Sequence, residues 1–382
     1  MVDIKRYTQE LSQLVALPSV SCATPSLDTS NRAVVELLAN WLADLGFACE
    51  LQPLPDQPHK ANLIATRGHG PGGLVLAGHT DTVPYDAHSW QQDPFDLTLR
   101  DDRLYGLGAT DMKGFFPVVL AALRGLDLNK LQAPITVIAT ADEETSMAGA
   151  RALALRGGFQ ARAAIIGEPT ALKPIRMHKG IMMEAVHVRG HSGHSSDPAL
   201  GNNALEAMHQ VMGELIRFRR ELQAQFSHPG FTVQVPTLNL GCIHGGDNPN
   251  RICGDCELQF DLRALPGMNN DELHAQLGAR LRPVAEALNV DITLRALFDD
   301  VPAFEQPAGS ALVRACESFS GQQAVSAAFA TEAPFLQSLG METVVLGPGS
   351  IDQAHQPNEF IPMAQLAPAT HLLRQLIAHY CH

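Results

Sequence analysis

Histidine, aspartate and glutamate residues follow several apolar runs of this sequence. These side chains are the residues best suited to bind a metal ion or to transfer a proton. The run LVLAG (74–78) is typical of a buried strand and leads directly into His79 and Asp81. In an extended chain, residues i and i+2 point to the same face, so this imidazole and this carboxylate reach the same place. Other candidates that follow an apolar run or a glycine-rich turn are Asp111, the pair Glu143 and Glu144, Glu168, and His355.

Imidazole and carboxylate ligands without a thiolate suit zinc, cobalt or manganese. The two histidines and the carboxylates are too many for one catalytic ion, which must keep a position open for water, but they suit two ions that share a carboxylate. Such a pair of ions can bind one hydroxide and polarise a carbonyl. Each residue taken alone could instead be a cap or a surface group. The recurrence of the pattern favours a hydrolytic metal centre.

The length and the charge balance limit the class of protein. With 382 residues the chain exceeds the size at which a single core usually splits, so two domains are expected. Lys and Arg total 27 against 40 Asp and Glu, and the formal charge of −13 argues against a nucleic-acid partner. The sequence has neither a long apolar run for a membrane span nor the apolar core of a signal peptide. We therefore expect a cytoplasmic protein without a membrane partner, whose seven cysteines are free thiols.

Before residue 180, strand-like apolar runs alternate with helical patterns, which predicts an α/β sheet with parallel strands. Strands are expected at 48–53, 62–66, 74–78, 134–144 and 161–169, and helices at 4–17, 26–47 and 112–126.

The pattern changes after residue 180. The expected elements are, in order, a strand at 181–190, a helix at 199–223, strands at 232–243 and 251–263, a helix at 269–288 and a strand at 290–297. This β-α-β-β-α-β order is typical of a ferredoxin-like α+β unit. The first pattern returns with a strand at 343–349 and a final helix. We therefore predict a mixed, mostly parallel α/β metal-binding domain formed by residues 1–179 and 298–382, with residues 180–297 inserted into it.

Six motifs resemble the dinuclear-zinc peptidase and deacylase family, which includes aminoacylases and carboxypeptidases, over nearly the whole chain. They are GHTDTVP, GLGATDMKGF, ATADEETSMAGA, IIGEPT, RGHSGHSSDP and GPGSIDQAHQPNE. The resemblance implies two divalent metal ions, zinc with cobalt as a substitute, in a zinc-peptidase-like domain. It implies the following ligands: Asp111 to both ions, His79 and Glu168 to one, and Glu144 and His355 to the other.

The resemblance also implies catalytic roles around these ligands. Glu143 would be the general base, taking a proton from a water held between the metals and passing it to the leaving amine. Asp81 would hydrogen-bond His79 and fix its tautomer. The peptide bond between Asp111 and Met112 is commonly cis in the family.

Three further residues are expected to complete the site. The resemblance implies that His194, in the inserted domain, reaches the active site of a partner subunit and stabilises the oxyanion, so the chain would be a homodimer through this domain. Arg251 could clamp the substrate's α-carboxylate with two parallel hydrogen bonds. Glu332 is the candidate partner for a distal ammonium group. His194 could instead be an ordinary histidine of a turn. Arg251 could be an ordinary surface arginine at the start of a strand.

The expected activity is removal of an acyl group from the α-nitrogen of a small amino-acid substrate. Within the family, the resemblance carried by SMAGAR, HGGDNPNRIC, TEAPF and GPGSIDQAHQPNE implies N2-acetyl-L-ornithine as the substrate, in arginine synthesis. Alternatives are succinyl-diaminopimelate, and other N-acyl amino acids or dipeptides. A binding protein that has lost its chemistry is disfavoured, because no ligand or base is missing.

Cys253 and Cys256 form a CxxC pair, which elsewhere indicates zinc or redox chemistry. Here the pair lies in a strand-like run, where i and i+3 face opposite sides, and no second CxxC exists. We interpret both cysteines as structural.

Overall fold

Four parallel strands, β6, β3, β7 and β15, form the middle of a nine-stranded sheet in the computed structural model, which describes residues 3–382. The strand order is β1-β2-β6-β3-β7-β15-β8-β13, with β14 paired to β8, and the flanking pairs are antiparallel. The strands are β1 Ala48–Pro53, β2 Ala61–Arg67, β3 Leu74–His79, β6 Ile135–Thr140, β7 Ala163–Pro169, β8 Ile175–His178, β13 Phe304–Glu305, β14 Val325–Ala327 and β15 Glu342–Gly347.

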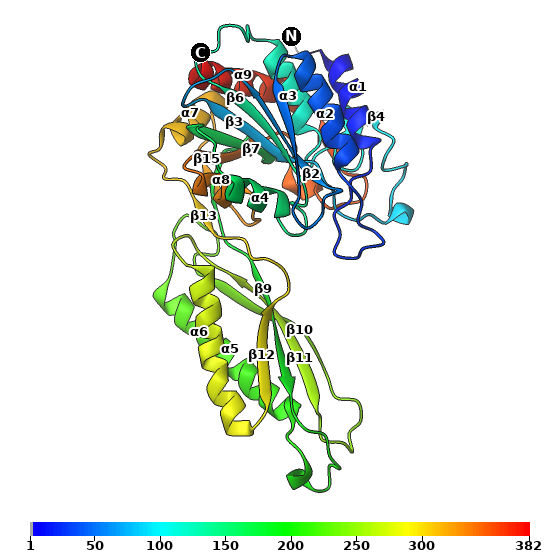
Figure 1. Cartoon of the computed structure of the whole chain (residues 1–382), viewed down its shortest axis with the longest axis vertical. Coiled ribbons are helices and arrows are strands. Elements are labelled where there is room, and N and C mark those ends of the chain that lie inside the picture. Colours follow the sequence, from blue (N-terminus) through cyan, green and yellow to red (C-terminus); the bar gives the residue numbers. More distant parts are fainter. Residues whose placement is uncertain (1–2) are drawn as a thin grey trace. The chain divides into compact units, whose positions relative to one another are not determined.

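Helices cover both faces of this sheet, which explains why its middle strands are continuous apolar runs. Every residue of β3, β6 and β7 is buried, as expected for parallel strands enclosed on two sides. One face shares a hydrophobic core with α1, α2, α3, α7 and α9, whereas α4 and α8 pack together and α8 packs on β15 (Figure 1). The helices are α1 Ile4–Val15, α2 Arg32–Asp44, α3 Phe115–Arg124, α4 Ala148–Arg156, α7 Ala311–Ser320, α8 Ala333–Ser338 and α9 Leu366–Cys381.

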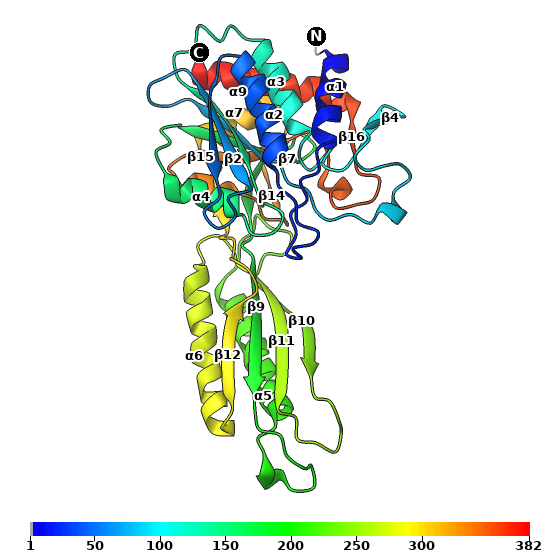
Figure 2. The ribbon, with the colours of Figure 1, turned by 45° about the vertical axis from the view of Figure 1, so that its right-hand side comes forward.

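A separate four-stranded antiparallel sheet has the order β10-β11-β9-β12 and packs against two helices, α5 and α6 (Figure 2). Its elements are β9 Met182–Arg189, α5 Ala204–Gln225, β10 Thr237–Gly245, β11 Asp255–Arg263, α6 Asn270–Leu288 and β12 Asp291–Ala296. Burial alternates along β11, because one face of the sheet packs on the helices. The expected β-α-β-β-α-β order and the mixed α/β class are thus confirmed.

The chain separates into two compact units. The first runs to Arg176 and adds Gln306–Val325 and Thr331–His382, and the second comprises Met177–Glu305 and Ser326–Ala330. The inserted domain expected at 180–297 lies within this second unit. Its limits as an independent domain stay a prediction.

Several elements are shorter than the sequence pattern predicts. The helix expected from residue 26 begins at Arg32, because the side chain of Asn31 is tied to the backbone of Ala61 and to Thr80 and holds the preceding segment in a loop. The strand expected at 134–144 ends at Thr140, and the chain then turns at Asp142, whose φ is 57°.

A small third sheet, β16-β5-β4, is formed by β4 Thr98–Arg100, β5 Arg103–Tyr105 and β16 Phe360–Pro362. It joins the segment before Asp111 to the segment after His355. Among residues 3–382, no helix is long and apolar enough to cross a membrane. All seven cysteines are free, as predicted, and Cys253 and Cys256 are buried in the hydrophobic core of the second unit.

Candidate metal centre

The carboxyl ends of the parallel strands deliver the predicted ligands to one place. His79 is the last residue of β3 and Glu168 lies near the end of β7, while Glu144 follows β6 by four residues. Ligands gather at this edge in α/β sheets because parallel strands all end there. Asp111 comes from the turn before α3, and His355 from the loop after β15, where its φ is 59°.

Asp111 lies at the centre of the cluster, and its two carboxylate oxygens face different partners. Oδ1 is 3.0 Å from Nε2 of His79, which in turn lies 3.9 Å from Oε1 of Glu168. Oδ2 is 3.5 Å from Nε2 of His355, which lies 3.0 Å from Oε2 of Glu144. The five predicted ligands therefore form two histidine–glutamate pairs on either side of one shared carboxylate. The peptide bond between Asp111 and Met112 is cis.

His79 is oriented by the backbone, not by the carboxylate, of Asp81. Its Nδ1 lies 3.0 Å from the Asp81 carbonyl oxygen but 3.7 Å from the nearer carboxylate oxygen. An Nδ1–H that donates to this carbonyl leaves the lone pair of Nε2 facing Asp111, as a metal ligand requires. The Asp81 carboxylate instead accepts hydrogen bonds from the backbone N–H groups of Glu143 and Glu144, at 3.2 and 3.0 Å. Asp81 is thus the hydrogen-bond partner of His79, as expected, but it contributes its backbone carbonyl oxygen and not its carboxylate.

The glutamate carboxylates of the cluster are buried close to one another and to Asp111, which disfavours their negative charge in the absence of a cation. Burial raises the pKa of Glu143, Glu144 and Glu168, and neighbouring carboxylates raise it further. Hydrogen bonds to Asp111 and Glu144 raise the pKa of His355 to about 10, so that its imidazolium supplies positive charge in the metal-free protein. Divalent ions would supply that charge when bound.

The arrangement fits metal binding by two further observations. One ligand atom from each of His79, Asp111 and Glu144 lies within 4.8 Å of the other two. Oε1 of Glu168 is buried and has no hydrogen-bond partner within residues 3–382. A buried carboxylate oxygen without a partner is unfavourable unless a cation completes its environment.

Glu359 is a residue of the site that the sequence analysis missed. Its side chain is buried, and its carboxylate accepts hydrogen bonds from the backbone N–H groups of Gly108, Thr110 and Asp111, at 3.0, 2.7 and 2.9 Å. Burial and the nearby charge of Asp111 raise its pKa to about 8. Glu359 therefore holds the turn that presents Asp111. The signal available in the sequence was its position four residues after His355, in the same GPGSIDQAHQPNE motif.

Replacing Glu359 with glutamine is expected to weaken metal binding and to lower kcat, each by about 10- to 100-fold, as for other residues that support metal ligands. The amide has one acceptor oxygen where the carboxylate has two, so it cannot serve all three N–H groups. Cobalt titration and steady-state kinetics measure the two effects. Glu342→Gln is a matched control, because Glu342 also accepts a backbone hydrogen bond, from Leu312, but outside the cluster. Equal metal affinity in the two variants would contradict this role.

The remaining predicted residues occupy two places. Glu332 is buried at the start of α8, and burial raises its pKa to about 7. Its charge interacts with those of His79 and Asp81, so it lies near the cluster. His194 and Arg251 belong to the second unit, where their backbones form a β-bridge, and Arg251 Nη1 lies 2.7 Å from the carboxylate of Asp247.

Comparisons with known proteins bear on this geometry. The sequence profile described as Peptidase family M20/M25/M40 matches residues 75–379. An acetylornithine deacetylase from Klebsiella pneumoniae (strain 342) is 50% identical over 368 residues, which cover 96% of this chain and 96% of the relative. One from Photorhabdus laumondii is 47% identical over 380 residues, which cover 100% of this chain and 98% of the relative.

Solved structures with the same fold are more distant in sequence. A tripeptidase from Staphylococcus aureus has a TM-score of 0.76 at 18% identity and covers 99% of this chain and 98% of its own. An M20 family metallo-carboxypeptidase from Sulfolobus solfataricus also has a TM-score of 0.76 at 18% identity, covering 97% of this chain and 98% of its own. At this identity the likeness shows the fold alone, and it confirms the predicted class.

Proposed function

Because the chain belongs to peptidase family M20/M25/M40, as the motifs predicted, we propose that it hydrolyses N2-acetyl-L-ornithine to L-ornithine and acetate. Its identity of about one half to acetylornithine deacetylases over nearly the full length supports this substrate. The reaction would then serve arginine biosynthesis. The observation that carries the proposal is the shared position of Asp111 between two histidine–glutamate pairs, with Glu143 beside them.

Two divalent ions, which we propose are zinc with cobalt as a substitute, would be held by His79, Asp111, Glu144, Glu168 and His355. When bound, such ions lower the pKa of water and polarise an amide carbonyl. The nitrogen and oxygen donors of this set suit both metals.

Glu143 is the proposed general base. Its backbone N–H donates a hydrogen bond to the carboxylate of Asp81, which anchors the residue. Burial raises the pKa of the Glu143 carboxyl group above its usual range, which favours the uptake of a proton. The carboxylate takes a proton from the attacking water while the water oxygen forms a bond to the amide carbon. It then returns the proton to the amide nitrogen as the carbon–nitrogen bond breaks, which releases a neutral amine.

His194 is proposed to donate a hydrogen bond to the oxyanion in the active site of a second copy of the chain. Its alanine variant is expected to lose about 10²- to 10³-fold in kcat, because one oxyanion donor is removed. Steady-state kinetics measure this loss. His191→Ala is a nearby control in the same loop, and its kcat should stay near that of the wild type. An unchanged kcat in His194→Ala would contradict the role.

Mixing two inactive variants tests whether His194 acts across a dimer. In a mixed dimer of His194→Ala and Glu143→Gln subunits, one site combines an intact Glu143 with the partner's intact histidine. Activity should therefore return on mixing and subunit exchange. If His194 acted within its own chain, every site would keep one defect and the mixture would stay inactive.

The two ends of the substrate have proposed partners, Arg251 for the α-carboxylate and Glu332 for the distal ammonium. In support of the second, Oε1 of Glu332 is buried and has no hydrogen-bond partner within residues 3–382. Glu332→Gln is expected to reduce the preference for acetylornithine over acetylnorvaline, which lacks the ammonium, by about 10-fold or more, as for a charged hydrogen bond of about 1.5–3 kcal/mol. Comparison of kcat/KM for the two substrates measures it, and an unaltered preference would refute the role.

The function itself is tested by comparing kcat/KM for acetylornithine, acetylmethionine and succinyl-diaminopimelate, with zinc or cobalt added. The proposal predicts that acetylornithine is the best substrate. A strong preference for the succinyl substrate would favour a desuccinylase, and similar values for the first two would favour a broad N-acyl-amino-acid deacylase. Absence of turnover with all three would favour a binding protein. The predicted cytoplasmic location stays a prediction.

A further inference from the structure

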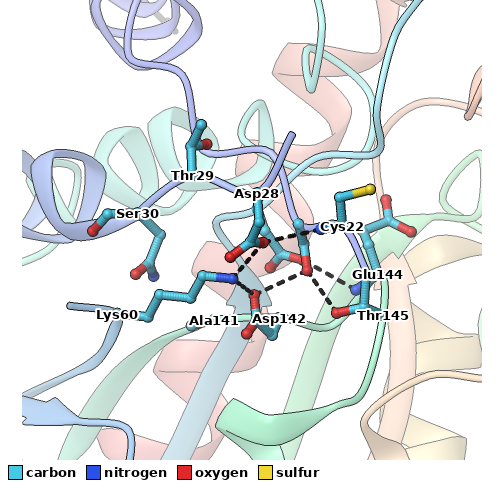
Figure 3. A network of polar contacts seen from close by, with 12 residues as sticks. Cys22, Asp28, Thr29, Ser30, Lys60, Ala141, Asp142, Glu144 and Thr145 are labelled. Carbon is cyan, nitrogen blue, oxygen red and sulfur yellow. Dashed lines mark hydrogen bonds and ion pairs between the residues drawn. The ribbon is translucent and has the colours of Figure 1, made fainter. Parts of the chain in front are cut away.

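A buried lysine, Lys60, belongs to a polar network that lies beside Glu144 (Figure 3). Lys60 directly precedes β2, and only 2% of its side chain is exposed. Its Nζ lies 2.6 Å from Oδ1 of Asp142 and 2.7 Å from Oδ1 of Asp28. Lysine is seldom fully buried, because its ammonium loses its hydration and needs charged partners in exchange. Here both partners are carboxylates.

The ammonium remains charged in this setting. Burial lowers the pKa of Lys60, but its hydrogen bonds to Asp142 and Asp28 and their charges outweigh burial and leave the pKa raised. The network therefore holds the positive charge of Lys60 next to the carboxylate of Asp142.

Asp142 directly precedes Glu143 and makes the turn that follows β6. Its φ of 57° is in the left-handed region, which a residue with a side chain adopts only when its surroundings hold it there. Its Oδ1 also accepts a hydrogen bond from Ser21 Oγ, at 2.9 Å, and its backbone oxygen accepts from Ser146 and Met147. The turn is thus held by both its side chain and its backbone.

Ser21 connects the two ends of residues 142–145, the segment that contains both glutamates and is called the glutamate segment below. Its hydroxyl lies 2.7 Å from Oγ1 of Thr145. Since the single hydrogen of Ser21 Oγ goes to Asp142, Thr145 must be the donor to Ser21. Figure 3 shows Asp142 and Thr145 facing the same cluster of side chains.

Four successive residues, 142–145, are therefore anchored. The anchors use the side chains of Asp142 and Thr145 and, through Asp81, the backbone N–H groups of Glu143 and Glu144. None of them uses a glutamate carboxylate. The two carboxylates are left free for the metal cluster and for proton transfer.

We propose that Lys60 is a positioning residue for Glu143 and Glu144, acting through Asp142, which it holds in the turn between β6 and the glutamate pair. The inference rests on the proposed function, because that function assigns the roles of the two glutamates. Without the ammonium, the Asp142 carboxylate would be buried without its cation, which is unfavourable unless the side chain moves. Such a movement loosens the turn and displaces both glutamates.

The test compares Lys60→Met with Arg124→Met. Arg124 forms another ion pair of the first unit with a buried carboxylate, 2.6 Å from Glu10, but it joins α3 to α1, away from the glutamate segment. Both variants lose a cation from such a pair, so both should melt at a lower temperature than the wild type. Only Lys60→Met is expected to lose about 10- to 100-fold in kcat and in affinity for at least one of two cobalt ions, with KM little changed. Rates are measured well below both melting temperatures and are expressed per folded molecule.

Ser21→Ala gives a second, milder test, in case Lys60→Met fails to fold. It removes one hydroxyl and leaves the ion pair in place. It should lower kcat and alter the visible absorption spectrum of the bound cobalt, while the melting temperature falls little. Cobalt affinities and spectra like those of the wild type in both Lys60→Met and Ser21→Ala would overturn the inference.

The two proposals can fail separately. An inactive wild-type protein that binds two cobalt ions would overturn the proposed function, while the cobalt affinity and spectrum of the variants would still test Lys60. An active wild type with unperturbed Lys60 and Ser21 variants would overturn only the role of Lys60.

Discussion

Replacing Asp111 with asparagine is expected to lower kcat by at least about 10³-fold, equivalent to about 4 kcal/mol of transition-state stabilisation. Each oxygen of Asp111 faces one histidine–glutamate pair, so the neutral amide weakens both metal sites at once. Removing metal from the wild type with a chelator should have the same effect. Added zinc should restore the chelated wild type but not the variant, and metal content and kcat measure both results.

Two outcomes would contradict this prediction. One is a wild type that stays active after its metal has been removed. The other is an Asp111→Asn protein that binds two ions with wild-type affinity. Asp86→Asn is a suitable control, since Asp86 caps a short exposed helix and its loss should leave both metal binding and kcat unchanged.

The same geometry sets the pH dependence of metal binding. In the metal-free protein, hydrogen bonds to Asp111 and Glu144 hold the pKa of His355 at about 10, so this histidine is protonated at neutral pH. A metal requires the neutral imidazole, so binding releases a proton and the apparent affinity falls as the pH falls. Calorimetric titrations in buffers of different ionisation enthalpy would detect that proton.

The second large effect is expected from Glu143→Gln, which should lower kcat by about 10²- to 10⁴-fold, the usual contribution of a general base. Metal content should be unchanged, because Glu143 is not in the ligand set. The adjacent variant Glu144→Gln is the matched comparison: it should lose metal affinity, because Glu144 lies 3.0 Å from His355 in the cluster. Metal titrations and kinetics on the two variants separate the two roles. If both lost metal equally, the assignment of different roles would be wrong.

The pH profile gives an independent check on Glu143. A general base works only when deprotonated, so kcat/KM of the wild type should rise with pH as Glu143 loses its proton. Burial and the nearby charge of Glu168 raise the pKa of this group, so the rise should lie at a higher pH than for an ordinary glutamate. The residual activity of Glu143→Gln should lack that dependence.

Much of the fold and most of the cluster could be predicted from the sequence, because the signals are local. The strands that carry His79 and Glu168 are short aliphatic runs, and parallel strands enclosed by helices require such runs. Where an apolar run ends in an imidazole or a carboxylate, the end of the strand itself positions the side chain. The list of candidate residues followed from this rule and from the glycine-rich turns, whereas the family resemblance supplied the ligand set and the roles.

Only the tertiary structure decided what holds these residues in place. Glu359 accepts hydrogen bonds from a turn 248 to 251 residues earlier in the chain, and Lys60 contacts Asp142 across 82 residues. Asp81 orients His79 through its carbonyl and not its carboxylate, a choice set by how the segment after β6 packs against it. Such contacts leave no periodic trace in the sequence, because they depend on distant segments meeting in the folded chain. The sequence alone thus determined the strands and most of the reactive groups, while packing between remote segments determined how those groups are held.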